Sequence, residues 1–307
     1  MTTTGRILLT GASGFVGAAV LRKLLAAGYG VNALVNRRPL TVEGDVRQVR
    51  GGLWDAAALD EAAAGCAGTI HLVGIIAERG RNTFQRVHVE GTASVLAACA
   101  RAGVRRYMQM SALGTRETAA SEYHRTKWAA EQLVRKSGLD WTILRPSMIH
   151  GPEGEFMRMV ADWARGKAPP FLFMPYFGRG LLGLGGAGQL QPVYVEDVAR
   201  AFVEALDRPE TIGKVYDLGG ADRLTWPEFH RTSAQAIVGR RQRVAAMPAW
   251  LAKTLARILP ASLLPFNRDQ VTMSQEDNTC DLTPFERDFG WRPRGFNETL
   301  PLYAATM

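Results

Sequence analysis

The stretch Thr10-Gly11-Ala12-Ser13-Gly14-Phe15-Val16-Gly17 decides the fold of this 307-residue chain. It follows a short apolar run, Arg6-Ile7-Leu8-Leu9, which is typical of a buried strand. Beyond it, Val16, Val20 and Leu24 recur at helical spacing. A strand, a glycine-rich turn and a helix in this order form the phosphate-binding start of a βαβ unit.

Each glycine of the turn has its own task in such a unit. Gly11 allows the tight turn, Gly14 lets the backbone approach a pyrophosphate, and Gly17 lets the helix pack closely on the strand. The helix N-terminus adds N–H donors and a partial positive charge. A glycine-rich turn can also be only a tight turn, but the flanking strand and helix favour a nucleotide site. We therefore expect the phosphates of a dinucleotide to lie on Gly11, Ala12, Ser13, Gly14, Phe15, Val16 and Gly17.

The residues after the second predicted strand, 31–35, indicate which dinucleotide binds. An NAD-binding unit carries an acidic residue for the ribose 2′-hydroxyl about twenty residues past the glycine turn. The sequence there is Asn36-Arg37-Arg38-Pro39, without an acidic residue. Because a guanidinium pairs well with a 2′-phosphate, Arg37 and Arg38 favour NADP(H) over NAD. The alternative is an ordinary charged loop.

Strand-like and helix-like segments alternate through the first half of the chain, which predicts an α/β fold with a Rossmann-type, doubly wound parallel sheet. We expect residues 1–150, joined by 191–220, to form the dinucleotide-binding domain. Residues 151–190 and 221–307 are expected to form a smaller domain on the substrate or partner side. The other predicted strands are 48–52, 69–73, 106–110 and 215–218, and the main predicted helices are 56–64, 84–102, 121–136, 155–165, 195–206, 226–238 and 248–259.

The composition narrows the class of protein. With 47% hydrophobic residues the chain can bury a full core. It has no apolar run of about eighteen residues, so no transmembrane helix is expected. The first six residues lead directly into the first strand and leave no room for a signal peptide. The three cysteines, Cys66, Cys99 and Cys280, lie far apart in the sequence, which favours reduced thiols in a cytoplasmic protein. The five histidines do not have the spacing of metal ligands, so no metal is expected.

The net charge of +8 suits an anionic partner. Anionic cofactors, acidic membrane surfaces and nucleic acid all qualify. Nucleic acid is the weakest of these, since the chain carries no basic stripe interleaved with aromatic residues.

A second group of chemically useful residues is Tyr123-His124-Arg125-Thr126-Lys127, on the helix predicted from residue 121. A spacing of four places the phenol of Tyr123 and the ammonium of Lys127 on the same helix face. A nearby cation favours the tyrosinate and draws a phenol pKa near 10 toward the range of a general acid–base group. The alternative is a solvated helix face, which the same spacing would also produce.

Together, the glycine turn and Tyr123-x-x-x-Lys127 resemble the extended short-chain dehydrogenase/reductase superfamily. Three later stretches resemble landmarks of that superfamily: 144–152, 191–198 and 290–293. Within it, Val87-His88-Val89-Glu90-Gly91-Thr92 and Met110-Ser111-Ala112-Leu113-Gly114 look most like one atypical branch. That branch includes the nucleotide-binding accessory subunit of respiratory complex I and its free-standing bacterial relatives.

The resemblance implies roles for individual residues. Tyr123 would be the acid–base group, Lys127 would hold the nicotinamide ribose and tune Tyr123, and Ser111 would hydrogen-bond a substrate carbonyl. Besides the glycine turn and the arginines, the implied cofactor-binding residues are Leu53, Val73, Gly74, His88, Tyr123, Lys127, Pro146 and Met148.

Two residues depart from the superfamily pattern. His88 stands where an asparagine usually supports a proton-relay water, and Gly52 stands where an aspartate often contacts the adenine. The loop between Ser111 and Tyr123 is also short. Cofactor binding is therefore better supported than turnover.

Two functions stay open at this point. The first is an NADP(H)-dependent oxidoreductase or epimerase acting on a small, apolar carbonyl or hydroxyl substrate. The second is a non-catalytic, nucleotide-binding accessory or assembly protein of a respiratory membrane complex.

Two apolar stretches, Pro169–Gly188 and Pro248–Phe266, belong to neither motif. The first is expected to be irregular, because its glycines and prolines break regular elements. Lys253 and Arg257 lie in the second, near the basic cluster 240–243. Core packing explains such residues, and so does weak, reversible association with the anionic inner face of a membrane, which we hypothesise.

Overall fold

The computed structural model describes residues 4–36, 38–259, 264 and 266–307, which fold into two compact units. The larger unit contains the residues up to Pro146, together with Val195–Leu218 and Leu282–Trp291. The smaller unit contains Ser147–Tyr194, Gly219–Asp281 and Arg292–Met307.

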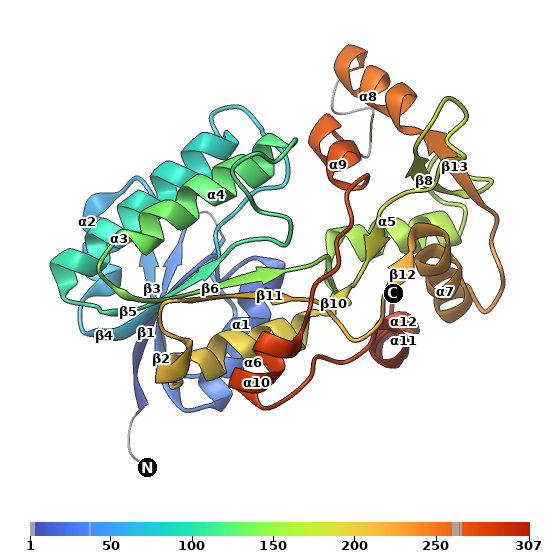
Figure 1. The fold of residues 1–307 in the computed structure, drawn as a ribbon. Helices are drawn as coiled ribbons and strands as arrows, with labels where there is room; N and C mark the ends of the chain where they lie inside the picture. Colours follow the sequence, from blue (N-terminus) through green and yellow to red (C-terminus); the bar gives the residue numbers. More distant parts are fainter. Residues whose placement is uncertain (1–3, 37, 260–263, 265) are drawn as a thin grey trace. The chain divides into compact units, whose positions relative to one another are not determined.

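A seven-stranded parallel sheet forms the centre of the larger unit (Figure 1). Its strand order is β11-β6-β5-β4-β1-β2-β3, and this doubly wound order confirms the predicted Rossmann-type fold. The order reverses between β1 and β4, where such sheets bind their ligands. The strands are β1 (Thr4–Thr10), β2 (Tyr29–Val35), β3 (Val46–Arg50), β4 (Cys66–His71), β5 (Arg106–Met110), β6 (Asp140–Pro146) and β11 (Lys214–Leu218).

Helices cover both faces of this sheet, with α1, α6 and α10 on one face and α2, α3 and α4 on the other (Figure 1). The helix after the glycine turn buries Val16, Val20 and Leu24, as their spacing predicts. The helical segments are α1 (Phe15–Ala26), α2 (Ala56–Ala63), η1 (Gln85–Glu90), α3 (Gly91–Ala102), α4 (Glu122–Arg135), α6 (Val195–Leu206), η2 (Pro209–Thr211) and α10 (Thr283–Phe289).

The helix predicted over 84–102 is two elements in the structure. A π-helical segment, η1, precedes α3 and contains His88. At the junction of the two elements, the Thr92 hydroxyl donates to the His88 carbonyl oxygen at 2.6 Å. Such π-helical segments often occur at functional positions. The strands predicted at 31–35, 48–52 and 69–73 each begin two or three residues earlier than expected.

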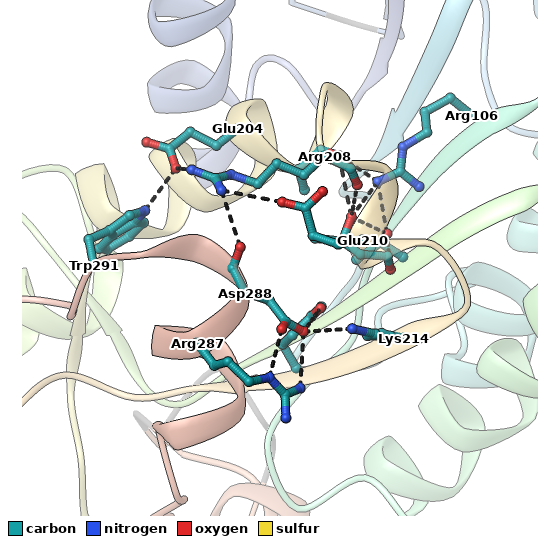
Figure 2. Close-up of polar contacts among 12 residues, drawn as sticks. Arg106, Glu204, Arg208, Glu210, Lys214, Arg287, Asp288 and Trp291 are labelled. Carbon is teal, nitrogen blue, oxygen red and sulfur yellow. Dashed lines mark hydrogen bonds and ion pairs between the residues drawn. The ribbon is translucent and has the colours of Figure 1, made fainter.

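The segment 282–291 belongs to the larger unit, although we assigned it to the smaller domain from the sequence. A polar network holds it there (Figure 2). The Asp288 carboxylate accepts hydrogen bonds from Lys214 at 2.8 Å and from Arg287 at 2.8 Å. The Trp291 indole donates to Glu204 at 2.8 Å. These contacts fasten α10 to β11 and α6.

Short two-stranded ladders and helices build the smaller unit. The strands pair as β7 with β10, β9 with β12, and β8 with β13. Trp163, Phe229 and Phe296 are buried in its hydrophobic core. Its elements are β7 (Ile149–His150), α5 (Glu155–Ala164), β8 (Met174–Gly178), β9 (Gln189–Leu190), β10 (Val193–Tyr194), β12 (Leu224–Thr225), α7 (Trp226–Val238), β13 (Val244–Pro248), α8 (Ala249–Ile258), α9 (Arg268–Met273), α11 (Phe296–Thr299) and α12 (Pro301–Ala304).

The prediction that residues 169–188 contain no regular element is wrong for β8. This strand pairs in parallel with β13, from Met174 opposite Val244 to Gly178 opposite Pro248. The partner strand lies far along the chain, so the local pattern of glycines and prolines carries no sign of it.

Across the described ranges, no helix combines the length and the apolar character needed to cross a bilayer.

Candidate functional site

The glycine turn between β1 and α1 has the geometry that its sequence predicts. Gly11 adopts a φ of 82°, which side chains other than glycine rarely tolerate. A Cβ on Gly17 would lie 1.9 Å from the Gly11 carbonyl oxygen, so only glycine allows the helix to begin here. A Cβ on Gly14 would meet only that same oxygen, at 3.3 Å. The space beside Gly14 is therefore open for a ligand.

The remaining residues of the turn split between core and surface. Ala12 and Val16 are buried, Phe15 is half-buried and Ser13 is exposed. Gly14 is the N-cap of α1 and has no side chain to satisfy the first N–H groups of the helix. Those groups are free to donate to phosphate oxygens.

A second centre lies at Gly74, just beyond β4. A Cβ built on Gly74 would lie 3.0 Å from Lys127 Nζ and 3.6 Å from His88 Nε2. Lys127 is only 3% exposed, and its ammonium donates to the Met110 carbonyl oxygen at 3.1 Å. Burial lowers the pKa of Lys127 to about 8, against the opposing effect of the Glu131 carboxylate. The structure thus brings together Gly74, His88 and Lys127, three residues that the sequence separates widely.

Tyr123 lies one helical turn before Lys127 on α4, as predicted. Its ring packs edge-on against His88 at 5.4 Å and Phe84 at 5.9 Å between centroids. Burial raises the pKa of Tyr123 to about 12. The expectation that Lys127 lowers this pKa is therefore wrong, because desolvation of the phenolate dominates.

His88 joins three parts of the larger unit. Its Nδ1 lies 2.9 Å from the Thr126 hydroxyl, and the Ile75 N–H donates to its Nε2 at 3.2 Å. Thr126 donates its own proton to a backbone carbonyl of α4, which favours a proton on Nδ1, and Nε2 lies 3.2 Å from both the nitrogen and the carbonyl oxygen of Ile75. Burial, aided by the Lys127 charge, lowers the pKa of His88 to about 2. The neutral His88 side chain therefore connects η1 to α4 and to the segment after β4.

A buried ion pair holds α4 on the sheet. The Arg145 guanidinium, on β6, donates to both carboxylate oxygens of Glu131 at 2.7 Å each. Glu131 is fully buried, and a pair of this geometry is specific in orientation. Thr126, Glu131 and Arg145 were missed from the sequence, since nothing in their local pattern shows which strand faces the helix.

Ser111 follows β5 directly and is 4% exposed. Its hydroxyl donates to the Thr115 hydroxyl at 3.4 Å. A Cβ on Gly114 would lie 3.1 Å from the His124 ring, so the turn after Ser111 packs on the first turn of α4. The structure therefore places Ser111 and Tyr123 on adjoining segments.

Four other predicted cofactor residues lie in different surroundings. Leu53 points into the core cluster between the sheet and α2–α4, so only its backbone is available to a ligand. Val73 packs on the same cluster, and the Pro146 carbonyl accepts the Leu113 N–H at 2.9 Å. Met148 belongs to the smaller unit and packs on that unit's core.

A hollow of about 300 Å³ lies where β2 and β3 end. It is lined by Val35, Asn36, Arg38, Pro39, Gln48 and Arg50. Val35 pairs with Arg50 in the sheet, which carries Arg50 to the same edge as Arg38. Arg50 was missed from the sequence, although parallel strands end at a shared edge. Arg37, the other predicted 2′-phosphate residue, lies outside the described residues.

The sequence model of the NAD-dependent epimerase/dehydratase family matches residues 7–219, which include most of the site residues described above. The chain belongs to that family. Ceramide reductase of Caulobacter vibrioides is 32% identical over 250 residues, which cover 80% of this chain and 74% of that protein. The mitochondrial NADH dehydrogenase (ubiquinone) 1 alpha subcomplex subunit 9 of Arabidopsis thaliana is 32% identical over 258 residues, but the match spans only 61% of its length. These matches confirm the resemblance to extended short-chain dehydrogenases/reductases and to the complex I subunit.

The fold of this epimerase/dehydratase family member is also that of a solved dinucleotide complex. MoeE5 in complex with UDP-glucose and NAD superposes with a TM-score of 0.74, covering 98% of this chain and 97% of that one at 22% identity. The family assignment and the open glycine turn agree on a nicotinamide dinucleotide as the cofactor of this chain. Gly14 and the α1 N-terminus would hold its phosphates, and Lys127 would lie beside Gly74 to hold its ribose.

Proposed function

We propose that this chain is an NADP(H)-dependent oxidoreductase acting on the carbonyl or hydroxyl group of a small, apolar substrate. The observation that carries the proposal is that Lys127 Nζ and His88 Nε2 both lie beside Gly74. Lys127 is one helical turn from Tyr123 on α4. Burial of the Lys127 ammonium destabilises the fold. A ligand that needs both this positive charge and the space beside Gly74 explains why the ammonium is buried there. The reductase among the relatives supports an oxidoreductase over an epimerase.

The protonation of the site favours reduction. With a pKa of about 12, Tyr123 holds its proton at neutral pH and can donate it to the oxygen of a carbonyl substrate. The nearby Lys127 ammonium then stabilises the phenolate that remains. Ser111 supplies a second hydroxyl for the substrate oxygen. A bound nicotinamide supplies or accepts the electrons of the reaction.

The hollow at the ends of β2 and β3 supports NADP(H) over NAD. Arg38 and Arg50 line it, and no carboxylate is found among the described residues of its lining. Two guanidinium groups suit a 2′-phosphate, whereas a free ribose 2′-hydroxyl is normally bound by an acidic side chain.

Turnover of Tyr123→Phe tests the chemistry. The variant keeps the ring and its packing but loses the proton, so NADPH binding should stay near that of the wild type while ketone reduction slows roughly a hundredfold or more. Tyr176→Phe, on β8 of the smaller unit, is the matched control and should keep the wild-type rate. The rates are measured from NADPH absorbance with a panel of ketones. An unchanged rate in Tyr123→Phe would remove Tyr123 from the mechanism.

The second candidate is a nucleotide-binding accessory or assembly protein of a respiratory membrane complex. The match to the complex I subunit is the observation in its favour. In that case Tyr123 and Lys127 form a cofactor clamp without turnover. For either function we expect a cytoplasmic protein, since the three buried cysteines, Cys66, Cys99 and Cys280, form no disulfide.

A further inference from the structure

Helix α8 exposes the residues that a surface helix normally buries. Ala249 and Ala252 face inward and are 9% and 0% exposed. Trp250 and Ile258 face solvent and are 52% and 71% exposed, and Leu251 is 36% exposed. In an ordinary amphipathic helix the large apolar side chains line the buried stripe and polar ones face water. Packing in the core of the smaller unit therefore does not explain the large apolar side chains on the exposed side of α8.

The turn that follows β8 extends this exposed surface. Leu181, Leu182 and Leu184 are 77%, 69% and 79% exposed. The Trp250 indole donates to the Leu181 carbonyl oxygen at 3.0 Å, and a Cβ on Gly183 would lie 3.1 Å from the Pro248 nitrogen. The turn therefore lies against the start of α8. We call the side chains of Leu181, Leu182, Leu184, Trp250, Leu251 and Ile258 the α8 face.

The concentration of exposed apolar side chains is specific to this region. Thirteen large apolar residues among the described ones are exposed, and nine of them fall within residues 171–184 and 250–259. Isolated exposed residues are normal on a protein surface, but a contiguous group marks an interaction site.

The charged side chains on the two segments that form the α8 face are all positive. Arg179 precedes the leucine turn, and Lys253 and Arg257 lie on α8. Residues 171–190 and 249–259 contain no aspartate or glutamate. The centre of a protein–protein interface is typically rich in tyrosine, tryptophan and arginine, with charges of both signs around it. The acidic residue Asp269 lies on α9, which packs on α8. Leucine and isoleucine on segments whose own charges are all cationic complement a lipid surface with anionic headgroups.

We propose that the α8 face docks the protein on an anionic membrane surface. With ten residues, α8 is only about 15 Å long, half the thickness of the hydrocarbon core of a bilayer. It would therefore lie in the plane of the interface, with Trp250, Leu251 and Ile258 among the acyl chains and the cations at the headgroups. This surface lies in the smaller unit, and the proposal does not depend on the activity proposed for the larger one.

Sedimentation of the full-length protein with vesicles tests the proposal. Vesicles of phosphatidylcholine alone are compared with vesicles that also contain phosphatidylglycerol. Because the two segments that form the face contribute three cations and no carboxylate, binding to the anionic vesicles should be tighter by roughly tenfold or more, and high salt should remove this difference. A protein that stays in the supernatant with anionic vesicles at low salt overturns the proposal.

Variants separate the α8 face from the rest of the surface. Ile258→Glu and Leu182→Glu should each abolish most of the binding, whereas Leu302→Glu should bind as the wild type does. Leu302 is a matched control because it lies on α12 and is 63% exposed. Replacing Lys253 and Arg257 by glutamine should remove most of the preference for anionic lipid but keep the weak binding to neutral vesicles.

Two further outcomes would contradict the proposal. Equal losses in Leu302→Glu and Ile258→Glu would mean that any added charge prevents sedimentation. A wild-type dimer that Ile258→Glu dissociates, without vesicle binding, would make the face an interface between protein chains.

Discussion

At Lys127, the same burial that holds the ammonium beside Gly74 also lowers its pKa to about 8. The larger part of its environment is apolar or neutral, since His88 carries no charge and Met110 offers only a carbonyl oxygen. The residue therefore opposes folding, and the proposed function gives it the role of holding the cofactor.

Lys127→Met should reverse both effects. At pH 7 we expect the free energy of unfolding to rise by about 1–3 kcal/mol, after allowing for the hydrogen bond lost at Met110. Nicotinamide cofactor affinity should fall by about 1.5–3 kcal/mol. Urea denaturation and calorimetry measure the two changes, and Lys136→Met, at the exposed end of α4, should alter neither.

The lowered pKa of Lys127 also predicts how the stability gain of Lys127→Met changes with pH. The folded protein releases the Lys127 proton near pH 8, whereas the unfolded chain keeps it until about pH 10.5. The unfolded state therefore binds more protons between these values, and wild-type stability rises across this window. The gain in stability from Lys127→Met should be fully present below pH 8 and shrink toward pH 10.5. A gain that grows with pH would contradict this account.

Gly14 and Gly17 allow a comparison between folding and binding. Gly17→Ala would place a Cβ 1.9 Å from the Gly11 oxygen, so the turn must open and stability should fall by several kcal/mol. Gly14→Ala would place its Cβ at 3.3 Å from the same oxygen, so the fold should survive with a loss of about 1 kcal/mol or less. Its Cβ would nevertheless occupy the space for the pyrophosphate, and cofactor binding should be lost. Cofactor binding by Gly14→Ala at wild-type affinity would place the pyrophosphate elsewhere.

Among the elements, those specified by neighbouring residues could be predicted from the sequence, and those specified by distant ones could not. The turn at Gly11–Gly17, the strand 106–110 and the helices 195–206 and 226–238 follow from local spacing. β8 depends on its pairing with β13, and His88 in the π-helical segment contacts Thr126 on α4, 38 residues further along the chain.

The same distinction applies to the candidate site. Tyr123 and Lys127 are visible as a spacing of four, but the raised pKa of Tyr123 comes from packing that no spacing shows. Arg50 joins the site only through the register of β2 and β3. For this reason the sequence predicts the candidate acid–base pair but not the environment that sets its protonation.

The ends of β2 and β3 provide a matched pair of arginines. Arg50 lines the hollow, whereas Arg47 on the same strand pairs with Glu61 at 2.6 Å. Arg50→Ala and Arg38→Ala should each weaken NADPH binding by about 1.5–3 kcal/mol and leave NADH binding unchanged. Arg47→Ala should change neither affinity. Calorimetry with NADPH and with NADH measures these affinities. Equal NADPH and NADH affinities in the wild type would refute the preference for NADP(H).

At the scale of the whole molecule, the two proposals of this account concern different units. The larger unit contains the glycine turn, Tyr123 and Lys127, and the hollow beside Arg50. The smaller unit carries the α8 face. The sequence predicted two domains but not that 282–291 returns to the larger unit, since the contacts of Asp288 and Trp291 link segments that are distant in the chain.

The central claim is that this chain turns over its cofactor instead of only holding it. The most direct measurement loads the protein with one equivalent of NADPH and follows the reduced nicotinamide by absorbance after a ketone or a quinone is added. The account predicts that bound NADPH is oxidised by at least one ketone, and that the oxidation is roughly a hundredfold slower or more in Tyr123→Phe. Bound NADPH that stays reduced with every ketone and quinone would contradict the account and leave the chain a nucleotide-binding accessory protein.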